Sequence, residues 1–433
     1  MDLSARIAVL RSGFNRSFWV GNVLELFERF AFYGSKAVLA VYLVERLGLG
    51  PLGSSLMGLY GFAIFFLPVL AGPFVDRYGF RRSLLACFSL FTLGYLSIGL
   101  AALPAGRPLV ALFGLKGWVV FSLVLTALGG SLIKPSIVGT VARTTDDSTK
   151  SLGYSIYYTL VNVGGMVGPL LALPVREGFG IEYVLVLSSG TSFLNLVGAF
   201  LFFREPASVP AAGAAGAAGT AVAVAGARSL GRVIGDMLLV FRNLRFISFL
   251  VLFSGFWIMF WQIFYSVPFY VRDVLGWQKF ELFEAIGPFT IILLTVPVTA
   301  LMKRVRPVAA MTAAFAVATL SWLLPALFPT VWAMAAAIAL FSVGETLQAP
   351  RFYEYVADIA PKEQVGTFMG FAFLPVAIGA LVAGPLSGWL VQHFLKEGRP
   401  PAGMWFVLAG IGVASTAGML LYDRFLKGSD LNN

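Results

Sequence analysis

One apolar segment near the start of the chain contains four charged side chains, Glu25, Glu28, Arg29 and Lys36. At 3.6 residues per turn, Glu25, Arg29 and Tyr33 lie on one face of a helix, and Lys36 follows close behind them. One arginine cannot fully neutralise two carboxylates, so one of the two glutamates should take up a proton readily. The spacing therefore predicts a site that binds and releases a proton. A static buried ion pair that holds helices together is the alternative.

Two further charges stand singly in apolar segments. Lys134 directly precedes a proline in a segment that contains small residues, and Glu345 is isolated far along the chain. A charge that faces lipid at mid-membrane costs at least about 2.5–3.5 kcal/mol, so these side chains must face partners or a water-filled cavity. Arg29 and Lys134 are a basic pair in the first half of the chain, and Glu345 is an acid in the second. A cavity so polarised suits a zwitterion of about one or two residues, with structural helix pairing as the alternative.

Helices that cross a membrane must position these charges, because the composition is that of a membrane protein. Of 433 residues, 58% are hydrophobic and 12% are charged, whereas an average soluble domain has about 25% charged residues. Roughly twelve apolar segments are long enough to span a bilayer as helices of about 20 residues. Their approximate ranges are 16–45, 52–75, 82–104, 110–141, 151–175, 181–203, 245–272, 279–302, 308–328, 330–358, 364–393 and 402–426.

The placement of basic residues predicts the orientation of these segments. We assign about 19 of the 31 lysines and arginines to loops on one side of the membrane and about 8 to the other. This positive-inside bias predicts a multi-pass protein of the cell (inner) membrane with both termini in the cytoplasm. The net charge of +10 is thereby explained by the lipid bilayer as partner, without nucleic acid.

A low-complexity segment divides the chain into two sets of six predicted helices. Residues 1–203 are expected to form an N-terminal six-helix bundle and residues 245–433 a C-terminal one. The cytoplasmic linker 204–244 combines an Ala/Gly-rich tether with a basic amphipathic stretch. This all-α layout, with two halves around a central cavity, resembles the major facilitator fold.

The sequence favours a carrier over an enzyme. Cys87 and His393 are the only residues of their kinds, so the chain offers no internal disulfide, no cysteine-based metal site and no histidine relay. No phosphate-binding glycine loop or nucleophile elbow is present. We therefore expect no metal and no cofactor, with a proton gradient carried by carboxylates as the coupling ion. We interpret Glu281 and Glu284, at the start of segment 279–302, as carboxylates that interact favourably with the positive end of the helix dipole.

At these residues the sequence resembles the proton-coupled oligopeptide transporter family. The family's motifs are an ExxER pattern with aromatics and a glycine in helix one, GxGxxKP in helix four, an asparagine before glycine in helix five, FWxxFxQ in helix seven and GE…P in helix ten. They correspond to Glu25, Glu28, Arg29, Phe30, Tyr33 and Gly34; to Gly129–Pro135; to Asn162 and Gly164; to Phe256, Trp257, Phe260 and Gln262; and to Gly344, Glu345 and Pro350. The loop from Gly72 to Arg82 is similar to the signature of the whole superfamily.

The resemblance implies a role for each of these positions. Glu25, Glu28 and Arg29 would form the proton switch, and Arg29 with Lys134 would bind the carboxylate of a peptide. Asn162 would hold the peptide backbone, Glu345 the amino terminus, and Trp257 would line a side-chain pocket. Tyr33 and Gln262 complete the implied substrate-binding set, and the implied gating residues are Lys36, Asp76, Arg77 and Arg81.

Four positions depart from the family pattern. Two tyrosines of the family align with Phe32 and Phe65, an asparagine aligns with Gly287, and the acidic gate partner of the family's basic residue aligns with Trp261. The first hypothesis is therefore a monomeric carrier that imports di- or tripeptides, or similar small zwitterions, with protons by alternating access. The alternative is a proton-linked carrier, exporters included, of another small organic metabolite. A non-transporting membrane sensor is a third reading, which the retained charges of helix one disfavour.

Overall fold

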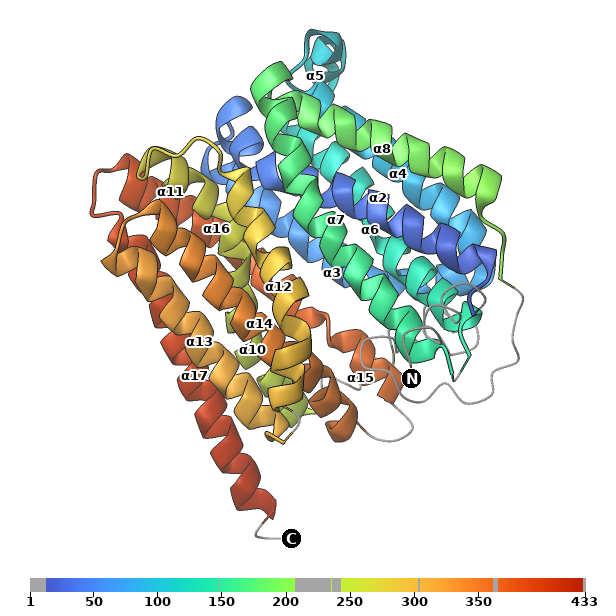
Figure 1. Cartoon of the computed structure of the whole chain (residues 1–433). Helices are drawn as coiled ribbons and strands as arrows, with labels where there is room; N and C mark the ends of the chain where they lie inside the picture. Colours follow the sequence, from blue (N-terminus) through green and yellow to red (C-terminus); the bar gives the residue numbers. More distant parts are fainter. Residues whose placement is uncertain are drawn as a thin grey trace. The chain divides into compact units, whose positions relative to one another are not determined.

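The computed structural model describes residues 13–146, 148–206, 235, 243–302, 304–360 and 365–430, and the described residues are almost entirely helical. Most of the predicted linker 204–244, including its tether, lies outside these residues. The long helices of the first half are α2 (Arg16–Val41), α3 (Pro51–Tyr78), α4 (Phe80–Leu100), α6 (Leu115–Thr144), α7 (Lys150–Phe179) and α8 (Ile181–Phe202). Those of the second half are α10 (Leu244–Tyr265), α12 (Glu281–Met302), α13 (Pro307–Leu327), α14 (Val331–Ile359), α16 (Leu374–Leu390) and α17 (Ala402–Asp430) (Figure 1).

Within the described residues, eleven helices are long and apolar enough to cross a membrane. The other long helix is α2, whose 26 residues bring the total to the predicted twelve. It differs from the rest because it contains Glu25, Glu28, Arg29 and Lys36. A helix satisfies its backbone hydrogen bonds within its own segment, so a long apolar segment in lipid folds as a helix. The charges of α2 cannot face lipid, so the residues that contact them must explain where this helix lies.

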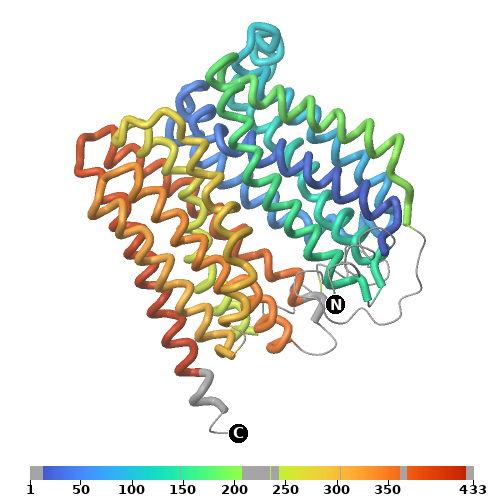
Figure 2. Tube along the Cα trace, viewed as in Figure 1, coloured from blue at the N-terminus to red at the C-terminus, as the bar shows by residue number. Residues whose placement is uncertain are grey.

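The helices pack into two compact units that do not follow the chain order strictly. Unit 1 comprises the described residues of Met1–Ser35 and Phe66–Val233, and unit 2 those of Lys36–Phe65 and Ile234–Asn433. The last part of α2 and the first part of α3 therefore belong with the helices of the second half. In unit 1, α4 packs between α6 and α8; in unit 2, α13 packs against α14 and α17, and α10 against α16 and α17 (Figures 1 and 2).

Three predicted spans continue or break in ways that their hydropathy did not indicate. The first span ends in a π-helical turn, η1 (Tyr42–Arg46). The predicted span 245–272 begins as α10 and continues as the short helix α11 (Val267–Asp273). The predicted span 364–393 is divided into α15 (Val365–Phe371), α16 and the π-helical turn η3 (Val391–Lys396). Pro375 lies at the start of α16, where its missing N–H group is tolerated, and not inside a continuous helix.

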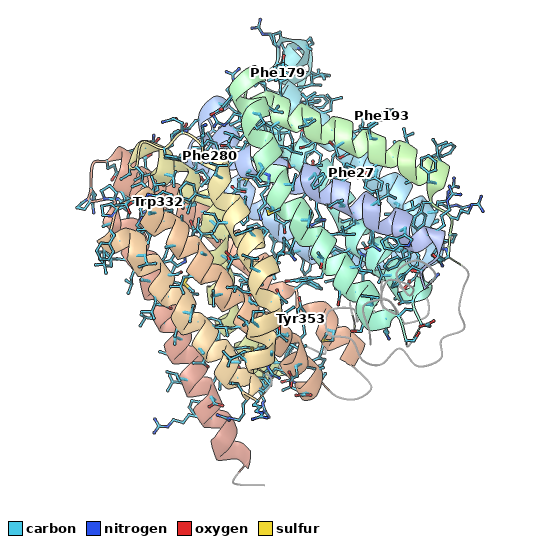
Figure 3. All side chains as sticks on the ribbon, in the orientation of Figure 1. Phe27, Phe179, Phe193, Phe280, Trp332 and Tyr353 are labelled. Atoms are coloured by element: carbon cyan, nitrogen blue, oxygen red, sulfur yellow. The ribbon has the colours of Figure 1, made fainter. Side chains whose placement is uncertain are left out.

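Large aromatic side chains are exposed on the surface of each unit. On unit 1, Phe27, Phe179 and Phe193 are 44%, 73% and 52% exposed (Figure 3). On unit 2, Trp332 is 83% exposed. Apolar surface of this extent is what a lipid-facing surface requires and what a water-facing one avoids.

Candidate functional site

The charged residues of α2 form a buried cluster in unit 1. Arg29 Nε lies 3.3 Å from Glu25 Oε1 and is also hydrogen-bonded to Glu28 Oε2. The three side chains are almost completely excluded from the surface, with exposed fractions of 0% for Glu25, 1% for Glu28 and 6% for Arg29. The prediction that one arginine is shared by two carboxylates is therefore matched by the contacts.

Each of the two carboxylates keeps one oxygen without a hydrogen bond. Glu25 Oε2 and Glu28 Oε1 are buried and have no partner among the described residues. Burying an ionised carboxylate is costly unless it is paired and hydrogen-bonded, whereas a protonated carboxyl avoids most of that cost. Two carboxylates at one guanidinium therefore disfavour the double ionisation of the pair.

Close contact between α2 and α7 positions Arg29. A Cβ atom on Gly164 would lie 2.4 Å from Arg29 Cβ, and one on Gly168 would lie 2.9 Å from the Gly34 nitrogen. Glycine at these positions lets the two helix backbones approach without a clash. The glycines that follow Asn162 in the sequence therefore hold the arginine face of α2 against α7.

Two neighbouring helices add polar groups to this cluster. From α7, Tyr157 Oη donates a hydrogen bond of 3.4 Å to Glu25 Oε1. From α6, Lys134 is close enough for its charge to act on Glu28 and to be acted on by Arg29. Asn162 is 9% exposed and its Nδ2 donates to the Tyr158 carbonyl oxygen at 2.9 Å. Tyr157 was not predicted from the sequence, where nothing pairs it with a residue 132 positions earlier.

Two aromatic rings of α2 lie near the guanidinium of Arg29. Arg29 Cζ lies 5.0 Å from the ring centroid of Phe32 and 6.0 Å from that of Tyr33. A cation over an aromatic face is attracted to its quadrupole. Phe32, where the related family has a tyrosine, is 5% exposed, so its ring supports Arg29 directly.

In unit 2, Lys36 lies in a box of aromatic rings from α10. Its Nζ is 3.2 Å from the ring centroid of Phe264, 4.2 Å from that of Trp261 and 5.6 Å from that of Phe260. We call these three rings the aromatic box. Phe65 in turn packs edge-on against Trp261, with 5.6 Å between centroids. Where the family pattern has an acid, this chain thus presents aromatic faces to the lysine.

The other predicted residues of the second half also lie in unit 2. Glu345 on α14 is partly buried, and the charge of Lys36 acts on it. Trp257 packs against Gly379 of α16, where a Cβ atom would lie 2.4 Å from Trp257 Cβ. Gln262 is fully buried and bridges helices: its Nε2 donates to the Ala383 carbonyl oxygen at 3.1 Å, and Ser266 Oγ donates to its Oε1. The amide of Gln262 is thus occupied by helix packing.

Three predicted gating residues lie on either side of the short loop at Gly79, at one end of unit 1: Asp76 and Arg77 in the last turn of α3 and Arg81 in the first turn of α4. The charge of Arg143 acts on Asp76, and Arg143 Cζ lies 4.5 Å from the ring centroid of Phe80. Arg77 Cζ lies 5.5 Å from the ring of Tyr78. Arg81 Nη2 donates to the Phe200 carbonyl oxygen at 2.8 Å.

Glu205, which was not predicted, anchors this loop. Its two carboxylate oxygens accept hydrogen bonds from the backbone nitrogens of Phe80 at 2.8 Å and Arg81 at 2.7 Å. A carboxylate at the first turn of α4 satisfies free N–H groups and favours the positive end of the helix dipole. The segment after α8 is thereby fixed to the start of α4.

A second group that the sequence did not predict is an ion cluster in unit 2. Arg272 Nη2 of α11 lies 2.6 Å from Glu45 Oε1 of η1 and 2.8 Å from Asp273 Oδ1. Lys396 Nζ of η3 lies 3.8 Å from Glu45 Oε1 and 3.4 Å from Asp273 Oδ2. Burial alone would lower the pKa of Arg272, but its hydrogen bonds with Glu45 and Asp273 outweigh burial and raise it. We call these four residues the latch cluster.

Comparisons with known proteins place the chain in context. Its residues 22–323 and 285–427 match the family model of the Major Facilitator Superfamily. It is 24% identical to the multidrug resistance protein MdtH of Klebsiella pneumoniae, over 80% of this chain and 79% of that one. It is 26% identical to the dipeptide and tripeptide permease A of Erwinia pyrifoliae, over 86% of this chain and 85% of that one.

The solved structures agree on the fold. A crystal structure of a POT family transporter in complex with thioalcohol conjugated peptide has a TM-score of 0.74 at 20% sequence identity. The similarity covers 94% of this chain and 96% of that chain. The predicted all-α major facilitator fold is confirmed, and the chain is a membrane-spanning protein of a transporter family and not an enzyme. This chain belongs to the Major Facilitator Superfamily.

Proposed function

We propose that this chain is a secondary active transporter that moves di- or tripeptides, or similarly small zwitterions, by symport with protons. The observation that carries the proposal is the buried cluster of unit 1. There, Glu25 and Glu28 share Arg29, and the charge of Lys134 acts on the same group. A proton that binds to a carboxylate frees part of the positive charge of Arg29 and Lys134 for another anion. The carboxylate of a substrate is the anion that these two side chains suit.

The rest of the predicted set completes this proposal. Glu345 would bind the amino group of the substrate, with Tyr33, Asn162, Trp257 and Gln262 as further binding residues. To bind substrate, Gln262 would exchange its hydrogen bonds with Ala383 and Ser266 for bonds to the substrate. Lys36, Asp76, Arg77 and Arg81 would act in gating as the halves 1–203 and 245–433 rock against each other in alternating access. The dipeptide and tripeptide permease of Erwinia pyrifoliae and the peptide complex of a POT family transporter support this substrate class.

A second candidate is a proton-linked carrier of another small organic metabolite, exporters included. The similarity to a multidrug resistance protein supports it. The replacement of polar groups by Phe32 and Phe65, both of which pack in aromatic contacts, and by Gly287 also favours it. A pocket with fewer hydroxyl and amide groups would bind a peptide backbone less specifically.

We further propose that the chain lies in the cell (inner) membrane as a monomer, with both termini in the cytoplasm. The uneven distribution of lysine and arginine supports this orientation. It would direct the latch cluster to the outer side of the membrane and Asp76, Arg77 and Arg81 to the cytoplasmic side.

Counterflow of a labelled dipeptide into proteoliposomes, with and without an inward proton gradient, tests the function. We expect accumulation that depends on the gradient and is competed by other dipeptides. Lys134→Ala should lower dipeptide uptake at least about tenfold, because hydrogen bonds to charged groups contribute about 1.5–3 kcal/mol.

The matched control is Lys116→Ala, which removes an exposed lysine from the same helix and should leave uptake unchanged. Equal uptake by Lys134→Ala and wild type would remove Lys134 from the substrate site. Absence of dipeptide counterflow in the wild type under either condition would favour the second candidate, for which a thermal-shift screen of metabolites is the next measurement.

A further inference from the structure

A second buried carboxylate in unit 2 has no role in the function proposed above. Glu284, on the first turns of α12, is 3% exposed. Both of its carboxylate oxygens are buried, and neither has a hydrogen-bond partner among the described residues. An ionised carboxylate without hydrogen bonds in such a position is very costly, whereas the neutral carboxylic acid is tolerated. The surroundings of the Glu284 side chain therefore favour its protonated form.

The charged neighbours of Glu284 come from two elements. Glu281, one helical turn earlier on α12, is fully buried, and its charge acts on Glu284. The charge of Lys36, from α2, acts on Glu284 and also on Glu345 of α14. Toward Lys36, α10 presents the aromatic box. One lysine is thus shared by carboxylates from α12 and α14.

This arrangement repeats the pattern of the cluster in unit 1. There, two glutamates three positions apart on α2 share a basic residue of the same helix, Arg29. On α12, Glu281 and Glu284 have the same spacing, and Lys36 supplies the positive charge. Two like charges so close disfavour the double ionisation of the pair. Lys36, whose Nζ lies in the aromatic box, can offset one of these two charges.

We propose that Glu284 is a second proton-binding carboxylate of the transporter, distinct from the Glu25/Glu28/Arg29 cluster. The proton binds reversibly to a Glu284 oxygen, and its release leaves a carboxylate whose counter-ion is Lys36. That Glu284 binds a proton does not depend on which substrate the chain carries. The part of this proton in coupling rests on the proposed function, in which it is a second proton carried in each transport cycle.

Infrared difference spectroscopy of the purified full chain, recorded during a pH titration, tests the proton binding directly. A protonated carboxyl has a C=O stretching band that disappears on ionisation. We expect Glu284→Gln to lose one titrating component of this band. In Lys36→Met, the same component should persist to higher pH, because a nearby positive charge that favoured the ionised form is gone.

Glu397→Gln is the matched control, because it removes an exposed carboxylate of unit 2 that pairs with His393. It should leave the buried-carboxyl band unchanged. An unchanged band in Glu284→Gln throughout the titration would overturn the proposal. Identical melting temperatures of the variants and wild type would ensure that the comparison is between folded proteins.

A transport measurement separates this inference from the proposed function. In vesicles with the membrane potential clamped at zero and a gradient of one pH unit, one coupled proton fewer lowers the maximal accumulation ratio about tenfold. We expect Glu284→Gln to show this loss while dipeptide counterflow continues. If the wild type transports no dipeptide and the infrared component is still lost, the proton site stands and the substrate assignment falls. If the wild type accumulates dipeptide and Glu284→Gln keeps both band and accumulation ratio, the proton site falls.

Discussion

At the scale of single residues, the central feature is a pair of buried carboxylates that share one arginine. Arg29 contacts two carboxylates, and the rings of Phe32 and Tyr33 lie near its guanidinium. Removal of one partner from a buried ion group is more damaging than removal of the whole group, because the remaining charge is left uncompensated. The cluster therefore depends on Arg29 for stability as well as for any role in transport.

We predict that Arg29→Ala destabilises the protein by about 3–5 kcal/mol, the range for a buried ion pair that loses one partner. The reason is that Glu25 and Glu28 would remain buried without their cation. Chemical or thermal denaturation of the detergent-solubilised protein at neutral pH measures the loss.

The control is the triple variant with Arg29→Ala, Glu25→Gln and Glu28→Gln, which removes the charges together. It should recover most of the stability, since no buried carboxylate is left without its cation. An Arg29→Ala protein as stable as wild type would mean that both glutamates are already neutral at the pH of the measurement.

At the scale of single elements, one helix start is fixed by a carboxylate in a loop. Asp146 Oδ1 accepts hydrogen bonds from Ser148 Oγ at 2.6 Å, from Thr149 Oγ1 at 2.9 Å, and from the backbone nitrogens of Ser148 and Thr149, both at 2.9 Å. Thr149 Oγ1 in turn accepts a hydrogen bond from the Asp146 nitrogen at 3.0 Å. These bonds form directly before α7, the helix that carries Tyr157 and Asn162. Hydrogen bonds from Ser148, then from Thr149, lower the pKa of Asp146 to about 2.

We predict that Asp146→Ala makes the first turn of α7 fray, because four hydrogen bonds to one carboxylate oxygen are lost. Hydrogen exchange of the backbone amides at the start of α7 should become faster, with little change in the middle of the helix. Asp146→Asn, which keeps an acceptor oxygen, should show a smaller effect.

The same helix start gives a prediction about pH. A folded-state pKa of about 2 lies below the ordinary aspartate value, so the stabilising effect is present above about pH 4 and is lost as the pH falls toward 2. The difference in exchange between wild type and Asp146→Ala should therefore persist at pH 5 and shrink below pH 4. A difference that grows on acidification would contradict this assignment.

At the scale of the whole molecule, two helices of the first half, α2 and α3, are each divided between the two compact units. Residues Lys36–Phe65 belong to unit 2, where Tyr265 Oη donates to the Met57 carbonyl oxygen at 3.0 Å. A Cβ atom on Gly384 would lie 2.5 Å from the Ser54 carbonyl oxygen, so α3 and α16 are in close contact. The latch cluster adds ion pairs between η1, α11 and η3. Any movement that separates 36–65 from unit 2 must break these contacts.

We predict that Arg272→Ala makes this end of unit 2 open more often. The test uses a Cys87→Ser background, because Cys87 is the only native cysteine, with Ser54→Cys as a single buried label site on α3. Partly exposed ion pairs contribute about 0–1 kcal/mol, so the rate of modification by a membrane-impermeant maleimide should rise about two- to fivefold.

The matched control is Arg306→Ala, which removes a different ion pair of unit 2, with Asp423. It should leave the rate of labelling at Ser54→Cys unchanged. Equal rates in Arg272→Ala and wild type would show that the contacts of α3 with α16 alone keep this end closed.

The sequence by itself determined the elements and the local chemistry. Long apolar runs can form only helices in lipid, so the number of spans and their approximate ends follow from composition. The grouping of Glu25, Glu28 and Arg29 follows as well, because helix periodicity alone brings residues three and four positions apart together. The resemblance to a known family also rests on such local motifs.

Only the tertiary structure decided the contacts between helices that are distant in sequence. Hydropathy does not say which face of an apolar helix meets which neighbour, so the Tyr157 bond to Glu25 and the aromatic box at Lys36 had no local signal. From the sequence, Glu284 was interpreted as a carboxylate that interacts with the positive end of the helix dipole. In the structure it is buried without a hydrogen-bond partner among the described residues. The physical reason is the same in each case: a charge acquires its role from what surrounds it, and those surroundings are assembled only when the helices pack.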